Sequence, residues 1–146
     1  MRAKELYDLD FFQWTQQNAD LLRRGRVDAA DLEHIAEELE DMGKSNKWTV
    51  QSFLRRLLVH LLKWQIQPAK RSKSWQNSIA NSRFRLESIF KQSPSLQRFA
   101  KNSVDEVYPK AVRQAAIQTG LDRKKFPREC PYTFAQLMDE DYLPEN

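Results

Sequence analysis

The stretch Val50 to Pro68, VQSFLRRLLVHLLKWQIQP, decides the fold of this chain. Its apolar residues recur at intervals of three and four, which places them on one face of an α-helix. The stripe is broader than the seam of a coiled coil, so it is typical of a central helix that neighbours cover on several sides. Pro68 ends the helix, because the residue before a proline disfavours helical geometry. The stripe comprises Val50, Phe53, Leu54, Leu57, Leu58, Leu61 and Leu62.

Two helical patterns precede this stretch. The first spans Leu6 to Arg24 and has Asp8 or Asp10 as its cap. The second spans Ala29 to Met42 and ends or kinks at Gly43. Because only a short link separates it from the central helix, we expect the two to be either antiparallel neighbours or one kinked helix.

Three more helical patterns follow, and no segment shows the alternation of a strand. Ser72 or Ser74 caps a fourth helix, and Ser95 caps a fifth. Pro109 lies inside the fifth helix and should kink or divide it, because proline removes a backbone donor. A short helix lies around Thr133 to Met138. The predicted class is therefore all-α, a bundle of five main helices and a short C-terminal helix.

Length and composition favour a single globular domain over residues 1–146. A chain of this length can bury roughly 70% of its unfolded surface. The single cysteine, Cys130, excludes an intramolecular disulfide and favours the cytoplasm. The first residues carry charges where a signal peptide would be apolar, and no apolar run approaches the ~20 residues of a membrane span. We expect a cytoplasmic protein that does not insert into a membrane.

Charge is distributed unevenly along the chain, although the net charge is only +4. Residues 1–42 hold 5 Lys and Arg against 11 Asp and Glu, whereas residues 43–128 hold 19 against 4. Residues 129–146 hold 5 acidic residues and no Lys or Arg. The basic middle is therefore either neutralised by the acidic ends or free to face an anionic partner.

Seven short motifs carry a family resemblance across nearly the whole chain. They are LYDLDFFQW, IAEELEDMG, HLLKWQIQP, SWQNSI, SPSL, QTGL and FPRECPY. With these motifs in this order, the chain resembles the domain of unknown function 29 family, which is common in cyanobacteria and found in other bacteria. The resemblance implies a small all-helical bacterial domain. The resemblance implies no particular reaction and identifies no catalytic residue.

A polar stripe on the central helix is the first candidate site. A histidine beside a carboxylate could act as a general base or a proton switch, because its pKa near 6.5 is easily moved. The alternative is a network of ion pairs and hydrogen bonds that fixes helix packing. The stripe comprises Arg56, His60, Lys63 and Gln67, and the carboxylates that could face it are Glu38 and Glu40.

Metal binding and cysteine chemistry have little support in the sequence. Asp31-x-x-His34 is the nearest approach to the Glu-x-x-His set of metal-binding bundles, but His34 points away from the apolar face of its helix. Cys130 lies in no recognisable nucleophile motif. We therefore expect no metal and no cofactor.

A basic segment with interleaved aromatic residues is the second candidate site. Its charges could contact phosphates and its aromatic rings could stack on bases, as in nucleic-acid binding. Trp64 and Trp75, however, occupy apolar helix positions, so the segment could equally be a solvated or internally paired face. The candidate contacts are Lys70, Arg71, Lys73, Arg83 and Arg85.

Three function hypotheses follow from these features. The leading one is a non-catalytic module that binds another macromolecule, most simply another protein. The alternatives are nucleic-acid binding through the basic segment and an enzyme that uses His60 with Glu38. The aromatic cluster Phe11, Phe12 and Trp14 forms either core or an exposed dimer surface.

Overall fold

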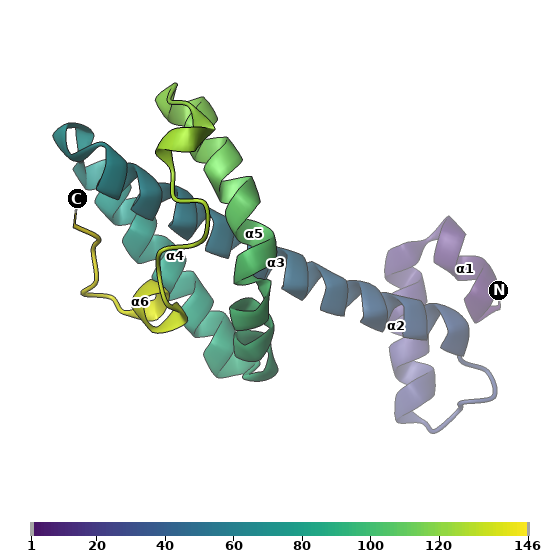
Figure 1. Ribbon diagram of the computed structural model, residues 1–146. Helices are drawn as coiled ribbons and strands as arrows, with labels where there is room; N and C mark the ends of the chain where they lie inside the picture. Colours follow the sequence, from purple (N-terminus) through teal and green to yellow (C-terminus); the bar gives the residue numbers. More distant parts are fainter. Residues whose placement is uncertain (1, 146) are drawn as a thin grey trace. The chain divides into compact units, whose positions relative to one another are not determined.

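The computed structural model describes residues 2–145, and within that range it contains helices and no strand (Figure 1). The predicted all-α class is therefore confirmed. The α-helices are α1 (Ala3–Leu9), α2 (Phe11–Arg23), α3 (Leu32–Ile66), α4 (Lys73–Gln92), α5 (Ser95–Thr119) and α6 (Phe134–Met138). Two short 3₁₀ helices, η1 (Pro68–Lys70) and η2 (Arg123–Lys125), lie in the connections.

The chain forms two compact units that divide between Ser45 and Asn46. The N-terminal unit holds α1, α2 and the first part of α3, and the C-terminal unit holds the remainder of α3 with α4, α5 and α6. The expectation of one domain over residues 1–146 stays a prediction.

Helix α3 runs through Gly43 without a break, so the antiparallel arrangement that the sequence allowed is wrong. A glycine inside a helix costs about 1 kcal/mol relative to alanine but does not by itself end the helix. Gly25 and Gly120, by contrast, have φ angles of 73° and 74° and follow the ends of α2 and α5. A helix that ends at glycine usually needs this left-handed conformation, which Gly43 does not adopt.

Side-chain caps set several helix boundaries. Asp10 leaves the helical region and accepts a hydrogen bond from the Gln13 amide, which separates α1 from α2 and divides the helix predicted from Leu6 to Arg24. Ser72 caps α4 through the Trp75 amide. Thr133 begins α6 with a capping box.

Pro109 does not divide α5, which corrects one of the two outcomes expected from the sequence. An interior proline costs ~3 kcal/mol because a backbone hydrogen bond is lost. Tyr108, Ala111 and Ala115 flank it and are buried in the core, so packing on both sides holds the helix together.

The central-helix prediction is confirmed in the C-terminal unit. Figure 1 shows α4 and α5 alongside this part of α3. Helix α3 there supplies side chains with no exposed surface, and these pack with Ile79 and Leu86 of α4 and with the alanines of α5. The fully covered residues of α3 are Val50, Leu54, Leu57, Leu58, Val59, Leu61 and Leu62.

Arg83 belongs to this core, which corrects its expected place on a basic surface. It is only 4% exposed. Its Nε donates a hydrogen bond to the Leu137 carbonyl at 2.8 Å, and its Nη2 donates to the Gln136 carbonyl at 3.1 Å. Arg83 thereby ties α6 to α4.

We expect Arg83→Met to lower the free energy of unfolding by about 2 kcal/mol, because two carbonyls of α6 lose a charged donor. Denaturant-induced unfolding followed by circular dichroism measures this change. Arg98→Met, at an exposed position of α5, is the matched control and should change stability by less than about 0.5 kcal/mol. Equal effects of the two substitutions would contradict the anchoring role.

Candidate functional site

The centre of the N-terminal unit is a polar cluster around Asp31. This carboxylate is buried and accepts hydrogen bonds from Trp14 Nε1 at 3.0 Å and from His34 Nδ1 at 2.6 Å. Asn18 is also buried, and its Oδ1 accepts a bond from the Asp31 amide at 2.8 Å. The His34 ring stacks on Tyr7 with ring centroids 3.8 Å apart. These contacts hold α1, α2 and α3 together.

Glu38 takes part in this unit and not in a pair with His60. It accepts a hydrogen bond from the Tyr7 hydroxyl, which raises the pKa of Tyr7 to about 12. Glu40 is exposed in the same unit. His60 lies in the C-terminal unit, several turns further along α3, whereas helix side chains that meet are three or four residues apart. The structure therefore does not bring His60 and Glu38 together.

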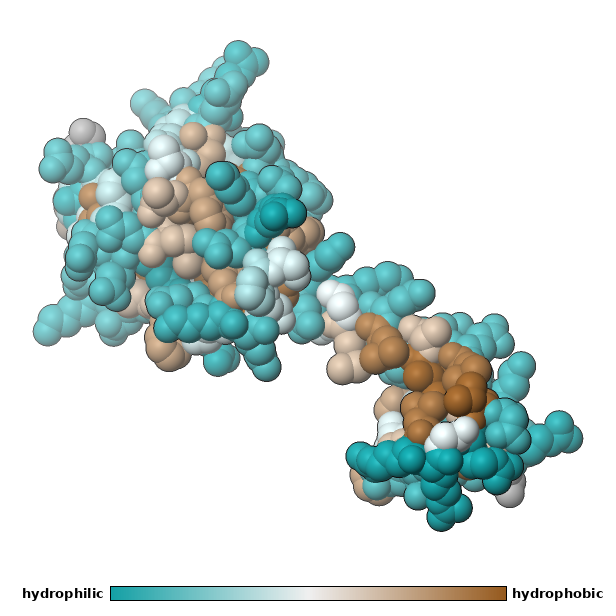
Figure 2. Space-filling view, turned by 90° about the horizontal axis from the view of Figure 1, so that it is seen from below, coloured by the Kyte–Doolittle hydropathy of each residue, from teal (hydrophilic) through white to brown (hydrophobic). Residues whose placement is uncertain are grey.

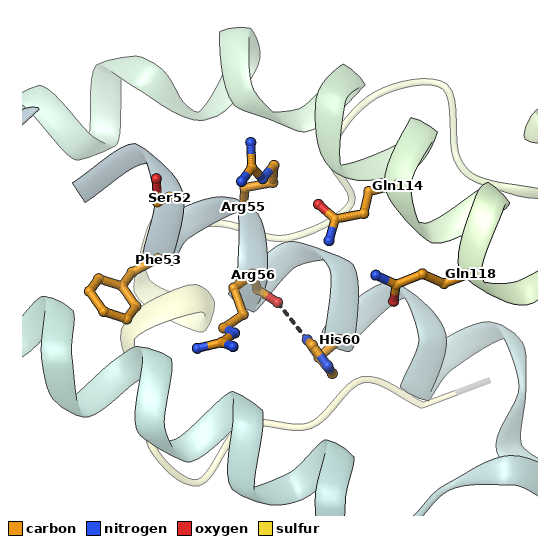
Figure 3. A pocket seen from close by; sticks show the side chains of 7 residues that line it. All are labelled: Ser52, Phe53, Arg55, Arg56, His60, Gln114 and Gln118. Atoms are coloured by element: carbon orange, nitrogen blue, oxygen red, sulfur yellow. Dashed lines mark hydrogen bonds between the residues drawn. The ribbon is translucent and has the colours of Figure 1, made fainter. Parts of the chain in front are cut away.

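A groove of about 350 Å³ lies over His60 in the C-terminal unit. Figure 3 shows Gln114 and Gln118 extending into it from α5 and His60 bordering it from α3. The Nδ1 atom of His60 lies 2.8 Å from the Arg56 carbonyl oxygen. Because a carbonyl only accepts, Nδ1 carries the proton, and Nε2 of the neutral ring carries a lone pair. The lining residues are Ser52, Phe53, Arg55, Arg56, His60, Gln114 and Gln118.

Of the remaining members of the predicted polar stripe, Lys63 contacts a residue that lines this groove. Lys63 Nζ donates to Gln118 Oε1 at 2.8 Å and lies 5.0 Å from the centroid of the Trp75 ring. Gln67 follows the last residue of α3 and is half-buried. Arg56, His60 and Lys63 thus lie along one side of α3, as the stripe predicted.

Fewer side chains of the basic segment are exposed and uncommitted than the sequence indicated. Arg83 is in the core, and only Lys70 and Lys73 project freely among the exposed residues of this group. Arg71 donates from Nε to the Trp64 carbonyl at 2.8 Å and lies over the Trp64 ring. Arg85 lies 5.6 Å from the centroid of the Phe53 ring. Nucleic-acid binding stays a prediction and would rest on the four residues other than Arg83.

The N-terminal unit carries an apolar surface of which the sequence singled out only the aromatic part. Figure 2 shows hydrophobic side chains, in brown, gathered on one face of this smaller unit. We call the exposed large apolar residues of this unit the N-terminal apolar surface. The sequence predicted the aromatic cluster of Phe11, Phe12 and Trp14 as either core or surface. Phe11 and Phe12 belong to this exposed surface, whereas Trp14 is buried. The surface comprises Leu9, Phe11, Phe12, Leu22, Val27, Leu32, Leu39 and Met42.

Neither a membrane-spanning helix nor a cluster of metal ligands occurs over residues 2–145. No helix among them has the length and apolar character to cross a membrane. No three His, Cys, Asp or Glu side chains in this range gather as metal ligands would.

The fold and these sites define an all-helical protein of two units, one with an exposed apolar surface and one with a cationic groove. The chain belongs to the family described as domain of unknown function DUF29, whose model matches residues 6–143. The family resemblance of the sequence motifs is thereby confirmed. Searches of curated proteins and of solved structures gave no match.

The two histidines should titrate on opposite sides of their ordinary pKa of 6.5. The hydrogen bond with Asp31 raises the pKa of His34, whereas desolvation and the cations Lys63 and Arg56 lower the pKa of His60. An NMR titration of the two ring Cε1–H signals measures both values. Asp31→Asn should return the pKa of His34 toward 6.5 and leave the pKa of His60 unchanged. A pKa of His34 below that of His60 in the unaltered protein would contradict the described contacts.

Protonation should also affect the N-terminal unit. Burial raises the pKa of Asp31, but its hydrogen bonds from His34 and Trp14 outweigh burial and lower the pKa below 3.8. The raised pKa of His34 adds stability below pH ~6.5 that is lost as pH rises through the folded value. The lowered pKa of Asp31 adds stability above pH ~3.8 that is lost as pH falls through the folded value. The His34–Asp31 pair is therefore fully effective only between pH ~4 and pH ~6.5.

Proposed function

We propose that this protein is a non-catalytic interaction module that binds an amphipathic helix of another protein through the N-terminal apolar surface. The proposal is based on the N-terminal unit, which exposes more large apolar side chains than it buries. Over residues 2–45 only Ala3, Leu6 and Trp14 are buried apolar side chains, whereas eight large apolar side chains are exposed. Exposed large apolar side chains that gather on one face, as Figure 2 shows for this unit, are characteristic of an interaction site.

The size of the N-terminal unit supports the same function. Chains of about 40 residues seldom bury enough apolar area to offset the conformational entropy lost on folding. The Asp31 cluster supplies specific hydrogen bonds but little hydrophobic stabilisation. A partner that covers the apolar surface would supply the missing burial.

The pattern of apolar residues along α3 supports the proposal of a helical partner. Leu32 and Val50 are 18 residues apart, which is five turns of 3.6 residues, so they share one side of the helix. Leu39 and Leu57 repeat this relation. In the C-terminal unit, helices pack against Val50 and Leu57 and leave them no exposed surface. Leu32 and Leu39 are 48% and 62% exposed, and a helix fits such a stripe.

The negative charge of the N-terminal unit favours a different protein as the partner over a second copy of this chain. Residues 1–45 hold 6 Lys and Arg against 11 Asp and Glu, a net charge of −5. Pairing two such surfaces in a symmetric dimer would bring like charges together, which is unfavourable. We infer a partner helix whose apolar face is flanked by Lys and Arg.

Photo-cross-linking in the native cells tests this proposal. Benzoylphenylalanine in place of Leu39 should form an adduct with a recurrent partner segment, identified by mass spectrometry as an amphipathic basic helix. The same group in place of Ile117, a residue of α5 that is 75% exposed, is the matched control and should not capture that segment. An adduct of twice the mass of the chain would show a second copy instead and would overturn the choice of partner.

Affinity measurements with the purified partner complete the test. The double substitution Leu39→Ser with Met42→Ser should weaken binding at least about tenfold, because two apolar contacts of ~1 kcal/mol or more are lost. Phe84→Ser with Ile117→Ser removes two equally exposed side chains from the C-terminal unit and should leave the affinity within about twofold. Equal losses in both double variants would refute the proposed surface.

A further inference from the structure

We propose that the groove between α3 and α5 is a binding site for a small phosphate monoester. The site lies wholly within the C-terminal unit and is independent of the N-terminal apolar surface. Its volume of about 350 Å³ suits a small metabolite, since ligand pockets begin near ~300 Å³. Six polar residues from two rigid helices provide the recognition: Ser52, Arg55, Arg56, His60, Gln114 and Gln118.

The charges of the groove favour an anion. The residues that line it include no Asp or Glu, although they include two arginines and a histidine. No described carboxylate forms an ion pair with Arg55, Arg56 or the adjacent Lys63. Both arginines line the groove, and Figure 3 shows their side chains leaving α3 in different directions. Arginine donates two parallel hydrogen bonds to phosphate, which suits this arrangement.

The uncharged groups of the groove complete the recognition of an oxyanion. Gln114 and Gln118 are four residues apart on α5, so their side chains lie on one face of that helix. Their amide groups and the Ser52 hydroxyl can donate to oxygen atoms that the arginines do not reach. Phe53 supplies an apolar wall for the carbon part of the ligand, and Arg85 of α4 lies over its ring.

His60 couples the site to pH. The charged groups near it are Arg55, Arg56 and Lys63 of α3, and the lining residues that α5 supplies are the uncharged Gln114 and Gln118. Desolvation and the cations Lys63 and Arg56 hold the pKa of His60 below 6.5, so the free protein has a neutral ring at neutral pH. A bound dianion raises that pKa, because it favours the charged imidazolium. Binding therefore takes up a proton at Nε2, and affinity for a dianion of constant charge rises as pH falls.

Sulfate is the first probe, because it remains doubly charged between about pH 8 and about pH 5. In an NMR titration, sulfate should shift the His60 Cε1–H signal and raise its pKa, and its affinity should increase toward pH 5. His34 lies in the other unit and is the internal reference. An affinity that does not change with pH, or an unshifted His60 signal, would overturn the proposal.

Ligand class is tested with glycerol phosphate and acetate at equal ionic strength. Glycerol phosphate should bind at least about tenfold more tightly than acetate, since it can accept bonds from more donors. Equal or tighter binding of acetate would show a carboxylate site and would overturn the assignment to phosphate monoesters.

Two variants locate the site. Arg55→Gln with Arg56→Gln should weaken sulfate binding at least about tenfold, because charge-assisted hydrogen bonds are lost. Arg98→Gln with Arg123→Gln removes the same charge from other surfaces of the unit, and equal weakening there would show non-specific attraction only. Gln118→Glu keeps the contact with Lys63 as an ion pair, so the fold is retained, yet the added negative charge should abolish sulfate binding. Retained binding in Gln118→Glu would exclude the groove.

Discussion

The apolar side of α3 must be covered, and the rest of the structure depends on this constraint. From Val50 onward, α4 and α5 supply the cover, and seven side chains of α3 lose all contact with water. Before Ser45 the same helix has only α1 and α2 as neighbours within its unit, and these pack through a hydrogen-bonded cluster around Asp31. One helix thus takes part in a well-covered core and in a unit whose apolar side chains face solvent.

Hydrogen bonds from side chains hold the irregular C-terminal segment on the C-terminal unit. Arg83 donates to the carbonyls of α6, and the Tyr108 hydroxyl donates to the Pro127 carbonyl at 2.6 Å. The Tyr132 hydroxyl donates to Gln65 Oε1 at 2.7 Å. The bonds from Arg83 and Tyr108 satisfy backbone carbonyls, so a segment with little regular structure can cover part of the core. The cationic groove lies on α3 and α5, which pack in the same core.

The sequence predicted those features of the fold that depend on residues close together along the chain, such as helix faces and helix ends. The stripe from Val50 to Leu62 was evident, and Asp10 and Ser72 were each one of two predicted caps, because helix periodicity and capping involve neighbours in sequence. The cap predicted at Ser95 was wrong, because Ser95 is the first residue of α5 and that helix begins without a side-chain cap. The predicted surface position of Arg83 was wrong, because its basic neighbours in the sequence suggested a solvated segment. Its spacing from Ile79, Leu86 and Phe90 follows a helix face, and this was the signal that could have placed it in the core.

Features that depend on which helices meet could not be predicted in this way. Gln114 and Gln118 join His60 only through the packing of α5 near α3, so the sequence named only Arg56 and His60 among the residues that line the groove. Periodicity likewise placed Leu39 and Met42 on an apolar face but could not show that no helix of their unit covers them.

Native-state hydrogen exchange of the α3 backbone amides tests the difference in cover most directly. In the protein without a partner, we expect amides after Val50 to exchange only through global unfolding, and those between Ile35 and Ser45 to exchange through local opening of lower free energy. Uniform protection along the whole of α3 would contradict this, because it would show that the N-terminal unit needs no further apolar cover.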